Sequence, residues 1–373
     1  MIFTVSSTAL CSRLQALARV LNSKNTLAIL DSFLFEIVDK SLTVTASDGE
    51  NVVVSKIELT ESNEDFSFCV SCKTIIDAVK EFAEEPLTFE INLGEMSATM
   101  IYHNGQNKLP IQTSESYPKF QPIADDANII TIEANKFEKA ISRSIFATAQ
   151  DELRPVMNGV AIDLKTDNLT IVASDGHKLV RTEYYDITDN DPGTFILPKK
   201  PAMLLKALLP KEGDVEMKFT KSSAIISFEN FTITCCLIEG KYPNYNSVIP
   251  QNNPNEVTVN RHSLLSALKR VLVFASQSSF LIRFSLENNK LTLSSEDLDY
   301  SKSAKEELVC EYFGQAMSIG FKGTSMIEIL SNIDCEDIIL KLADPSRAGV
   351  VVPAVKEENT DVLMLLMPML LND

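Results

Sequence analysis

The sequence is poor in the residues and patterns from which enzyme active sites and membrane segments are built. It has only three histidines, no glycine-rich loop of the kind that holds phosphates, and no His-Glu-x-x-His motif, so it contains no nucleotide-binding or zinc-hydrolase signature. No apolar run approaches the roughly 20 residues that span a bilayer. The longest, Val362–Leu371, is half that length and is interrupted by Pro368. We therefore expect a soluble protein that is not an enzyme, binds no cofactor and does not contact membranes.

The cysteines are few and have no spacing typical of a disulfide framework. There are seven, an odd number. Cys69 and Cys72 form a lone Cys-x-x-Cys pair with no histidine nearby, and the adjacent Cys235 and Cys236 point to opposite faces of a strand, which makes a poor chelate. We expect neither a disulfide nor a bound metal. Arg13 is the first basic residue, so the N-terminus does not resemble a signal peptide, and we expect a cytoplasmic protein.

What the sequence does contain is a repeat. Ser41–Gly49 (SLTVTASDG) recurs 127 residues later as Asn168–Gly176 (NLTIVASDG), and a weaker copy, Lys290–Leu298 (KLTLSSEDL), follows after another 122. A period of this length is a common size for an independent domain. The repeat therefore predicts three domains, over residues 1–125, 126–253 and 254–373.

Each third has the same predicted order of elements. It opens with a short strand, at the centre of which lie Thr4, Thr131 and Thr258, and an amphipathic helix follows. The apolar stripes of these helices are Leu10, Leu14, Leu17 and Leu21; Phe137, Ile141 and Ile145; and Leu264, Leu268 and Leu272. Alternating strands come next, with Asp48-Gly49 and Asp175-Gly176 as hairpin turns. A second helix, predicted over 73–82, 201–209 and 324–330, precedes three further strands. The fold class is α+β, with two helices per domain packed on antiparallel sheets.

Positive charge is concentrated on four of the six predicted helices. The net charge is −17, which by itself argues against nucleic acid as a partner. The four segments 9–21, 136–146, 199–211 and 262–274 nevertheless hold eleven basic residues and one acidic residue, a net charge of +10 that leaves −27 for the rest. Lys136, Lys139 and Arg143 lie on the face opposite the apolar stripe. An ordinary solvated helix surface stays an alternative, but the pattern favours contact with phosphates without base readout.

Several short motifs, in order and at characteristic spacing, resemble those of a known family. The three-fold unit, Ser174–Leu179 (SDGHKL), Lys241–Tyr245 (KYPNY) and Met367–Leu370 (MPML) together resemble the bacterial DNA polymerase III β subunit family, the replicative sliding clamps, along the whole chain. The resemblance implies a head-to-tail homodimer whose six clamp domains close into a ring, with helices lining the hole. It implies a processivity factor that holds double-stranded DNA topologically and tethers the replicative polymerase, the clamp loader, and other polymerases and repair proteins through a hydrophobic cleft.

The resemblance also implies three sets of site residues. The DNA-facing set is Lys24, Lys73, Lys136, Lys139, Arg143, Gln150, Arg154, Lys199, Lys200 and Lys206. The partner-peptide cleft is Met157, Ser174, Gly176, His177, Lys178, Leu179, Pro243, Ser247, Val248, Leu365, Met367, Pro368, Met369 and Leu370. The dimer interface is Lys108, Leu109, Phe274, Glu306 and Glu307. Ser247 and Leu370 stand where relatives often have arginine, and Pro155 and Val156 where they often have aromatic residues.

Two other classes of function stay open at this point. A metal-dependent nuclease would need several carboxylates converging on a metal, and only Asp344 and the segment Asp334–Asp337 suggest such a group. A repeat scaffold that binds proteins and no DNA is the second alternative, and the basic helix faces weigh against it. Reversing the charge of Lys136, Lys139 and Arg143 would leave a pure scaffold unaffected.

Overall fold

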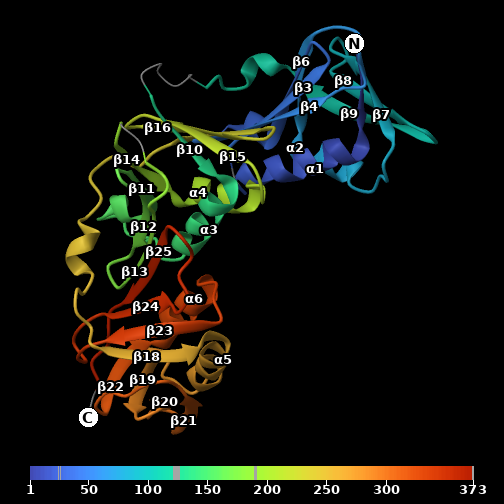
Figure 1. Cartoon of the computed structure of the whole chain (residues 1–373). Coiled ribbons are helices and arrows are strands. Elements are labelled where there is room, and N and C mark those ends of the chain that lie inside the picture. The colour runs from blue at the N-terminus through green and yellow to red at the C-terminus, as the bar shows by residue number, and fades with distance from the viewer. Residues whose placement is uncertain (24, 26, 121–126, 189–190, 372–373) are drawn as a thin grey trace. The chain divides into compact units, whose positions relative to one another are not determined.

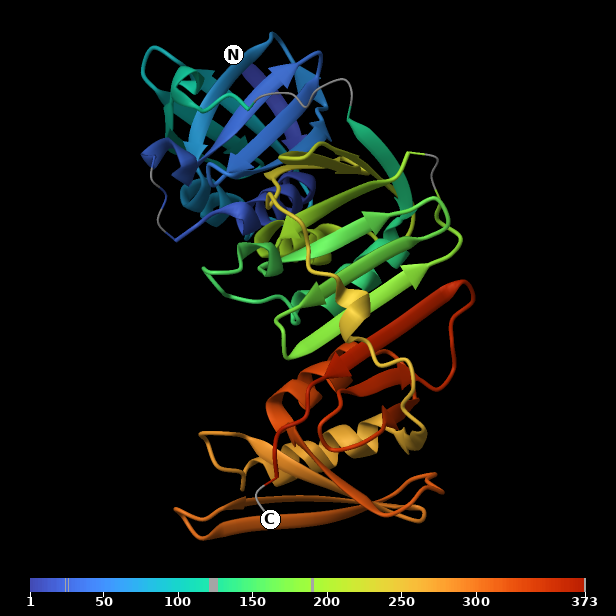
Figure 2. The same ribbon diagram turned by 90° about the vertical axis from the view of Figure 1, so that its left-hand side faces the viewer.

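The computed structural model describes residues 1–23, 25, 27–120, 127–188 and 191–371 (Figures 1 and 2). They form two compact units: unit 1 consists of Met1–Glu138 and Met203–Leu237, and unit 2 of Lys139–Ala202 and Ile238–Asp373. Lys24 and the domain boundary expected between residues 125 and 126 lie outside the described residues. The boundary expected between residues 253 and 254 stays a prediction.

Unit 1 is built around one 13-stranded sheet with the strand order β10-β15-β16-β17-β4-β3-β2-β6-β9-β8-β7-β1-β5. Two helices, α1 (Ser7–Leu17) and α2 (Cys72–Val79), contact each other and strands of this sheet. The strands are β1 (Ile2–Ser6), β2 (Ser32–Val38), β3 (Ser41–Ser47), β4 (Asn51–Glu58), β5 (Glu61–Ser62), β6 (Phe66–Ser71), β7 (Pro86–Asn92), β8 (Ser97–Tyr102), β9 (Gly105–Gln112), β10 (Asn128–Glu133), β15 (Asp214–Phe219), β16 (Ser223–Phe228) and β17 (Phe231–Cys236).

Unit 2 contains two sheets, one of eight strands in the order β14-β11-β12-β13-β25-β24-β23-β18 and one of four in the order β21-β20-β19-β22. Its helices α5 (Arg261–Leu272) and α6 (Gly323–Asn332) contact each other. The strands are β11 (Gly159–Leu164), β12 (Leu169–Ser174), β13 (Lys178–Tyr184), β14 (Gly193–Pro198), β18 (Asn255–Asn260), β19 (Leu281–Glu287), β20 (Lys290–Asp297), β21 (Lys302–Val309), β22 (Met317–Lys322), β23 (Asp337–Leu342), β24 (Gly349–Pro353) and β25 (Thr360–Leu366). Residues of α3 (Ala134–Ile145) and α4 (Lys199–Leu208) belong to both units.

The predicted order of elements is confirmed in all three repeats. Each repeat runs strand, helix, three strands, strand, helix, three strands, and the first has one additional two-residue strand, β5. The turns at Gly49 and Gly176 have φ of 98° and 91°, a backbone conformation that glycine adopts readily. The helix ends differ by a few residues from those predicted: α4 begins at Lys199, two residues before Pro201, and α2 ends at Val79. None of the helices among the described residues combines the length and hydropathy of a membrane span.

Helices α1, α2 and α5 each begin where a strand ends on a capping side chain. The hydroxyls of Ser6 and Ser71 accept hydrogen bonds from the backbone N–H groups of Ala9 and Thr74, and the side-chain oxygen of Asn260 accepts one from Ser263. Such caps satisfy N–H groups that have no partner inside the helix. The apolar stripes then point into the core: the fully buried residues include Leu10, Leu14, Leu17, Phe137, Ile141, Leu264 and Leu268.

Successive repeats are joined by the same antiparallel strand pair. β4, the third of the strands that follow α1, pairs with β17, the last strand of the second repeat. β13, the equivalent of β4 in the second repeat, pairs with β25, the last strand of the third. Because these pairs continue the sheets from one repeat into the next, the middle repeat contributes its two halves to different compact units.

The segment that follows β25 is held on the edge of β22. The Met367 N–H donates a hydrogen bond to the His177 carbonyl at 2.8 Å, and the Met369 N–H donates one to the Gly320 carbonyl, also at 2.8 Å. Gly320 permits this close approach, since a Cβ there would lie 2.7 Å from the Met369 oxygen and 2.8 Å from Leu371 Cδ2. We call residues Met367–Leu371 the C-terminal segment.

Replacing Gly320 with alanine should therefore displace the C-terminal segment and lower the free energy of unfolding by about 1–3 kcal/mol, a typical effect of overpacking. Chemical denaturation gives the stability, and hydrogen exchange at the Met369 amide reports the displacement. Gly94→Ala is the matched control, because the nearest atom to its Cβ, at 3.4 Å, belongs to a side chain. Equal stability of the two variants would show that the contact with the C-terminal segment does not constrain position 320.

Candidate functional site

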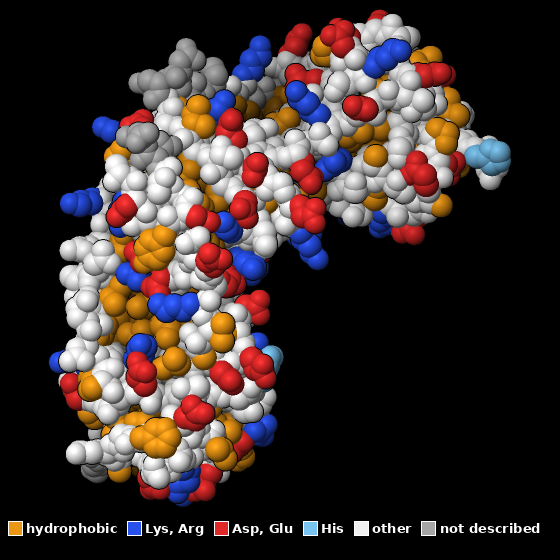
Figure 3. Space-filling view, viewed as in Figure 1, with side chains coloured by type: hydrophobic (Ala, Val, Ile, Leu, Met, Phe, Trp, Pro, Cys, Tyr) orange, Lys and Arg blue, Asp and Glu red, His pale blue; other side chains and the backbone are white. Residues whose placement is uncertain are grey.

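A cluster of apolar side chains lies where β13 and β25 meet. Leu179 and Leu365 are directly opposite each other in the two strands. The buried members of the cluster are Ala161, Val172, Leu179, Ile196, Tyr242, Ala348 and Leu365, and the partly buried residues packed against them are Val156, Ile238, Tyr245, Ile249 and Leu363. In Figure 3 hydrophobic side chains gather over the part of unit 2 where β13 and β25 lie in Figure 1. The half-buried members give this cluster a partly exposed edge.

Most of the predicted cleft residues surround this cluster or follow its strands. Leu179 and Leu365 belong to it, and Met157 is also buried, with 5% of its surface exposed. Val248, Met367 and Leu370 are 54%, 41% and 85% exposed. The remaining exposed or half-buried ones are Ser174, Gly176, His177, Pro243, Ser247, Pro368 and Met369. The structure thus places apolar side chains at solvent beside an apolar floor, an arrangement that suits a short hydrophobic peptide.

Tyr242 connects the apolar cluster to the end of β12. Its side-chain oxygen accepts a hydrogen bond from the Ser174 N–H at 2.8 Å. Burial raises the pKa of Tyr242 to about 12, so the phenol stays neutral at physiological pH. The sequence analysis missed Tyr242 as a floor residue, although it belongs to the quoted motif KYPNY, and it also missed Ala348 and Leu363. Only the pairing of distant strands brings them together.

Lys178, predicted as a cleft residue, points away from the cluster. Successive side chains of a strand face opposite sides, so Leu179 faces the apolar cluster and Lys178 the helix side. There its ammonium group lies 2.6 Å from a carboxylate oxygen of Glu328 in α6 and 5.5 Å from the centre of the Phe146 ring. The residue is only 9% exposed.

The loop before Met157 lies beside the same wall. Arg154, predicted to face DNA, pairs with Asp151 at 2.8 Å, and one of its guanidinium nitrogens lies 3.3 Å from where a Cβ on Gly176 would be. Gln150 is exposed. Val156 packs on the apolar cluster.

The predicted DNA-facing residues on helices differ in solvent exposure and in the ion pairs that they form. Lys73 and Lys206 are exposed, and Lys199 and Lys200 are half-buried at the start of α4. On α3, Lys136 pairs with Glu133 at 3.2 Å. Lys139 and Arg143 both lie near Glu357, at 3.6 and 3.7 Å.

Arg143 is more enclosed than its helix position suggested. It is 6% exposed, and its Nη1 atom is buried with no hydrogen-bond partner among the described residues. The helical periodicity correctly placed Arg143 opposite Ile141, but the sequence could not show that Glu357, more than 200 residues away, approaches that face. Direct contact of Arg143 with a phosphate stays a prediction.

The predicted dimer residues lie on or near strands β9 and β21. Lys108 pairs with Glu95 at 3.2 Å, while Leu109 is 7% exposed and belongs to the core. Glu306 forms an ion pair with Arg270, and Glu307 lies 3.5 Å from Lys305. Phe274 is 40% exposed. Their role in an interface stays a prediction.

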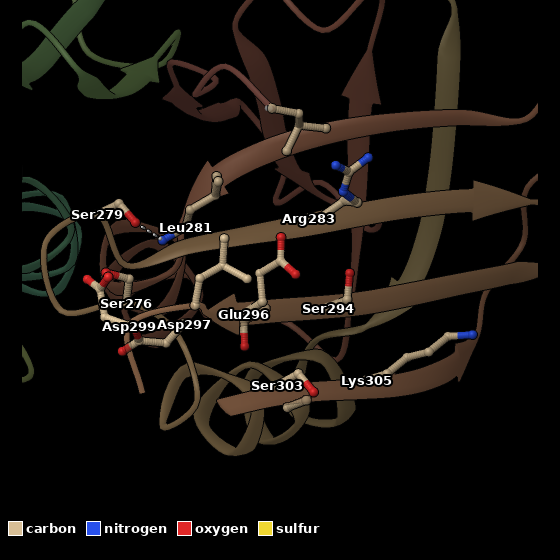
Figure 4. Close-up of a pocket in the computed structure, with 14 residues that line it drawn as sticks. Ser276, Ser279, Leu281, Arg283, Ser294, Glu296, Asp297, Asp299, Ser303 and Lys305 are labelled. Atoms are coloured by element: carbon tan, nitrogen blue, oxygen red, sulfur yellow. Dashed lines mark hydrogen bonds between the residues drawn. The ribbon is translucent and has the colours of Figure 1, made fainter. Parts of the chain in front are cut away.

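A groove of about 770 Å³ lies on the face of the four-stranded sheet. Figure 4 shows its lining, with Arg283, Ser294 and Glu296 on adjacent strands and Lys305 on β21. The charges are mixed. Within the described part of the chain, no group of three or more His, Cys, Asp or Glu residues is arranged to hold a metal.

The acidic residues that suggested a nuclease form ordinary local contacts. Asp344 accepts a hydrogen bond from the Ser346 N–H at 2.9 Å, and Asp337 accepts one from the Asn260 amide at 3.2 Å. All seven cysteines are free thiols, with Cys69 and Cys72 at the junction of β6 and α2.

Comparisons with known proteins agree along the whole chain. Residues 1–121, 131–244 and 246–369 match the N-terminal, central and C-terminal domain models of the DNA polymerase III beta subunit. The beta sliding clamp of Pseudomonas aeruginosa is 27% identical over 371 residues, covering 98% of this chain and 99% of that protein, and the one of Pseudomonas putida is 26% identical over 366 residues, covering 97% and 98%. The crystal structure of the Pseudomonas aeruginosa sliding clamp bound to griselimycin has a TM-score of 0.93 at 25% identity, with both chains fully covered.

The fold and these likenesses define a sliding clamp, a class of processivity factors that are not enzymes. The chain belongs to the bacterial DNA polymerase III beta subunit family.

Proposed function

We propose that two copies of this chain pair head to tail into a ring that encircles duplex DNA, and that the cleft tethers other proteins to it. These partners are the replicative polymerase, the clamp loader, and other polymerases and repair proteins that carry a short hydrophobic motif. The complex works in the cytoplasm. The single observation that supports the ring is the strand pair that joins successive repeats. In the described part of the first and the third repeat, one of the two strands that form this pair has no partner from another repeat.

These two strands are β21 and β9. β21 is the equivalent of β4 and β13 but, in the part of the chain that the structure describes, pairs only with β20, at the edge of its sheet. β9 is the equivalent of β17 and β25, and its residues Gly105–Pro110 pair only with β8 among the described residues. A second copy supplies the missing partner for each. Because the same contact then forms twice, the assembly closes with two-fold symmetry.

The surface around β21 supports self-association. Leu298 and Tyr300, in the turn that precedes this strand, are 83% and 72% exposed, and Val309 at its end is 89% exposed. Phe274 adds an exposed aromatic ring after α5. Several large apolar side chains about one edge strand are typical of an interaction surface.

DNA contact in such a ring rests on charge alone. The helix lysines Lys73, Lys199 and Lys206 offer positive charge, and the acids near α3 partly neutralise Lys136 and Lys139. Contacts that are weak, screened by salt and independent of sequence let a ring move along the duplex. The closed ring around the duplex then keeps the polymerase on its template, and tight binding to phosphates is not needed.

The cleft proposal rests on the apolar cluster and its exposed rim. Val248 is exposed and directly precedes Ile249, which packs on the cluster, and Met367 is exposed two residues after the cluster residue Leu365. Methionine adapts to differently shaped ligands, which suits a site shared by several partners. Ser247 and Leu370, in place of arginine, make this cleft more apolar than those of many relatives.

The ring predicts one strand register at the interface. If β21 and β9 pair as β13 pairs with β25, Ser303 of one copy lies opposite Lys108 of the other. Lys108→Cys combined with Ser303→Cys should therefore give covalent dimers with a short bismaleimide, as seen on a denaturing gel. Each single variant is the control, because native thiols include the exposed Cys236. A dimer in solution that the double variant fails to crosslink would refute this register, and a monomer at micromolar concentration would refute the ring.

The basic helix residues should set the salt dependence of processive synthesis. The logarithm of the affinity falls as the logarithm of the salt concentration rises, and each lost phosphate contact reduces the steepness of this slope by about 0.9. The Lys73→Ala, Lys199→Ala, Lys206→Ala triple variant should therefore shorten polymerase products on primed circular DNA at low salt and flatten their salt dependence. The control replaces three lysines outside the helices, Lys165, Lys218 and Lys341, each of which is paired with an acid. Equal effects of both triple variants would exclude a specific role for the helix lysines.

A labelled Gln-Leu-Ser-Leu-Phe peptide should bind the intact chain and lose affinity when the rim is changed. We expect Val248→Asp and Met367→Ala each to raise the Kd at least 10-fold in fluorescence anisotropy, because the first places a charge, and the second removes apolar surface, where an apolar peptide would bind. Val355→Asp is the matched control, since Val355 is also exposed, at 81%, but is not one of the predicted cleft residues. No binding by the intact chain would require withdrawal of the partner assignment.

A further inference from the structure

The cleft wall formed by the turn between β12 and β13 is tied to the third repeat through one buried lysine. Lys178 is the first residue of β13, and its ammonium group lies 2.6 Å from Glu328 of α6 and 3.6 Å from Asp175 in the turn itself. The lysine side chain is 11% exposed, whereas the Glu328 side chain is 46% exposed. An ion pair shielded on one side in this way is less screened by solvent than one between two surface groups.

The first repeat contains the same turn without such a tie. Asn51 is the equivalent of Lys178, since Ser47–Val52 and Ser174–Leu179 are matching strand pairs. The Asn51 amide donates to both oxygens of Asp48, at 3.3 and 3.0 Å. Asparagine therefore closes this turn by itself. At the second turn, lysine retains the contact with the aspartate and in addition reaches a helix 150 residues away.

The same turn also orients the C-terminal segment. The Asp175 carboxylate accepts hydrogen bonds from the N–H groups of His177 and Lys178, at 2.8 and 2.9 Å. The His177 carbonyl in turn accepts the Met367 N–H. A shift of the turn thus moves Met367 and Gly176 together, and both border the proposed cleft.

From these contacts we infer that Lys178 is a positioning residue for the peptide cleft, which acts through Glu328 by fixing the turn against α6. This inference rests on the cleft assigned under the proposed function. The Lys178–Glu328 ion pair joins the second repeat to the third, and the proposed cleft includes residues of both repeats. The ion pair therefore fixes the turn between β12 and β13 relative to the third repeat. A peptide then binds a preformed site and does not have to order the turn.

The test is a double-mutant cycle with the internal mimic of the first repeat. Lys178→Asn keeps a side chain that can close the turn on Asp175 and removes the tie, and Glu328→Gln removes the charge at its other end. Each should raise the Kd of the Gln-Leu-Ser-Leu-Phe peptide about 3- to 10-fold. The double variant should bind the peptide no more weakly than either single variant, because the two substitutions remove the same interaction.

A second readout separates positioning from a general loss of stability. Hydrogen exchange at the Met367 amide should become faster in Lys178→Asn, while exchange at the Met369 amide, bonded to Gly320, should stay unchanged. If the two substitutions had additive effects on the Kd, the inference would be wrong and the cleft assignment would stand. The same holds if the intact chain binds the peptide and both single variants have an unchanged Kd. An intact chain that binds no peptide would refute the cleft assignment, and the inference would fall with it.

Discussion

The architecture depends on one repeated interaction, the antiparallel pairing between the third strand after the first helix of one repeat and the last strand of the next. In β4–β17 and in β13–β25 the backbones exchange hydrogen bonds across repeats. A strand at the edge of a sheet presents unpaired N–H and C=O groups, and pairing them with the next repeat removes that exposure. Successive repeats are therefore joined by continuous sheet and not merely by linkers. The proposed ring applies this contact at the chain ends as well.

The candidate cleft is a by-product of the same pairing at one junction. Leu179 and Leu365 lie opposite each other because β13 pairs with β25 in this register. The equivalent positions at the other junction are Val52 and Thr234. There the pairing places a hydroxyl where the second junction has an apolar side chain. The cluster at the second junction thus includes a residue from each of the two paired strands, and Tyr242 and Ile249 add to it from the segment that leads to β18. The corresponding cluster of the first repeat, formed by Leu30, Cys69 and Tyr117, includes no residue of β4 or β17.

Periodicity and internal repetition were enough to predict the order of the elements, the fold class and the apolar helix stripes. Each of these depends on neighbours within about ten residues, and local patterns record them. Contacts between repeats could not be predicted from such local patterns. Glu357 beside Arg143 and Glu328 beside Lys178 are separated from their partners by well over a hundred residues. For Lys178, alternation along the strand was available and would have placed it opposite Leu179. Its assignment to the cleft followed from motif resemblance alone.

The edge strand β21 has a further consequence for the newly made chain. Until it finds a partner, an exposed strand is a template on which any extended segment can add. Exposed or half-exposed charged side chains recur along this strand at Lys302, Lys305, Glu306 and Glu307. Charges on an edge disfavour stacking of like strands into aggregates, since growth would bury them without suitable counter-ions. The composition of β21 thus disfavours fibril-like self-assembly of the single chain before the proposed dimer would form.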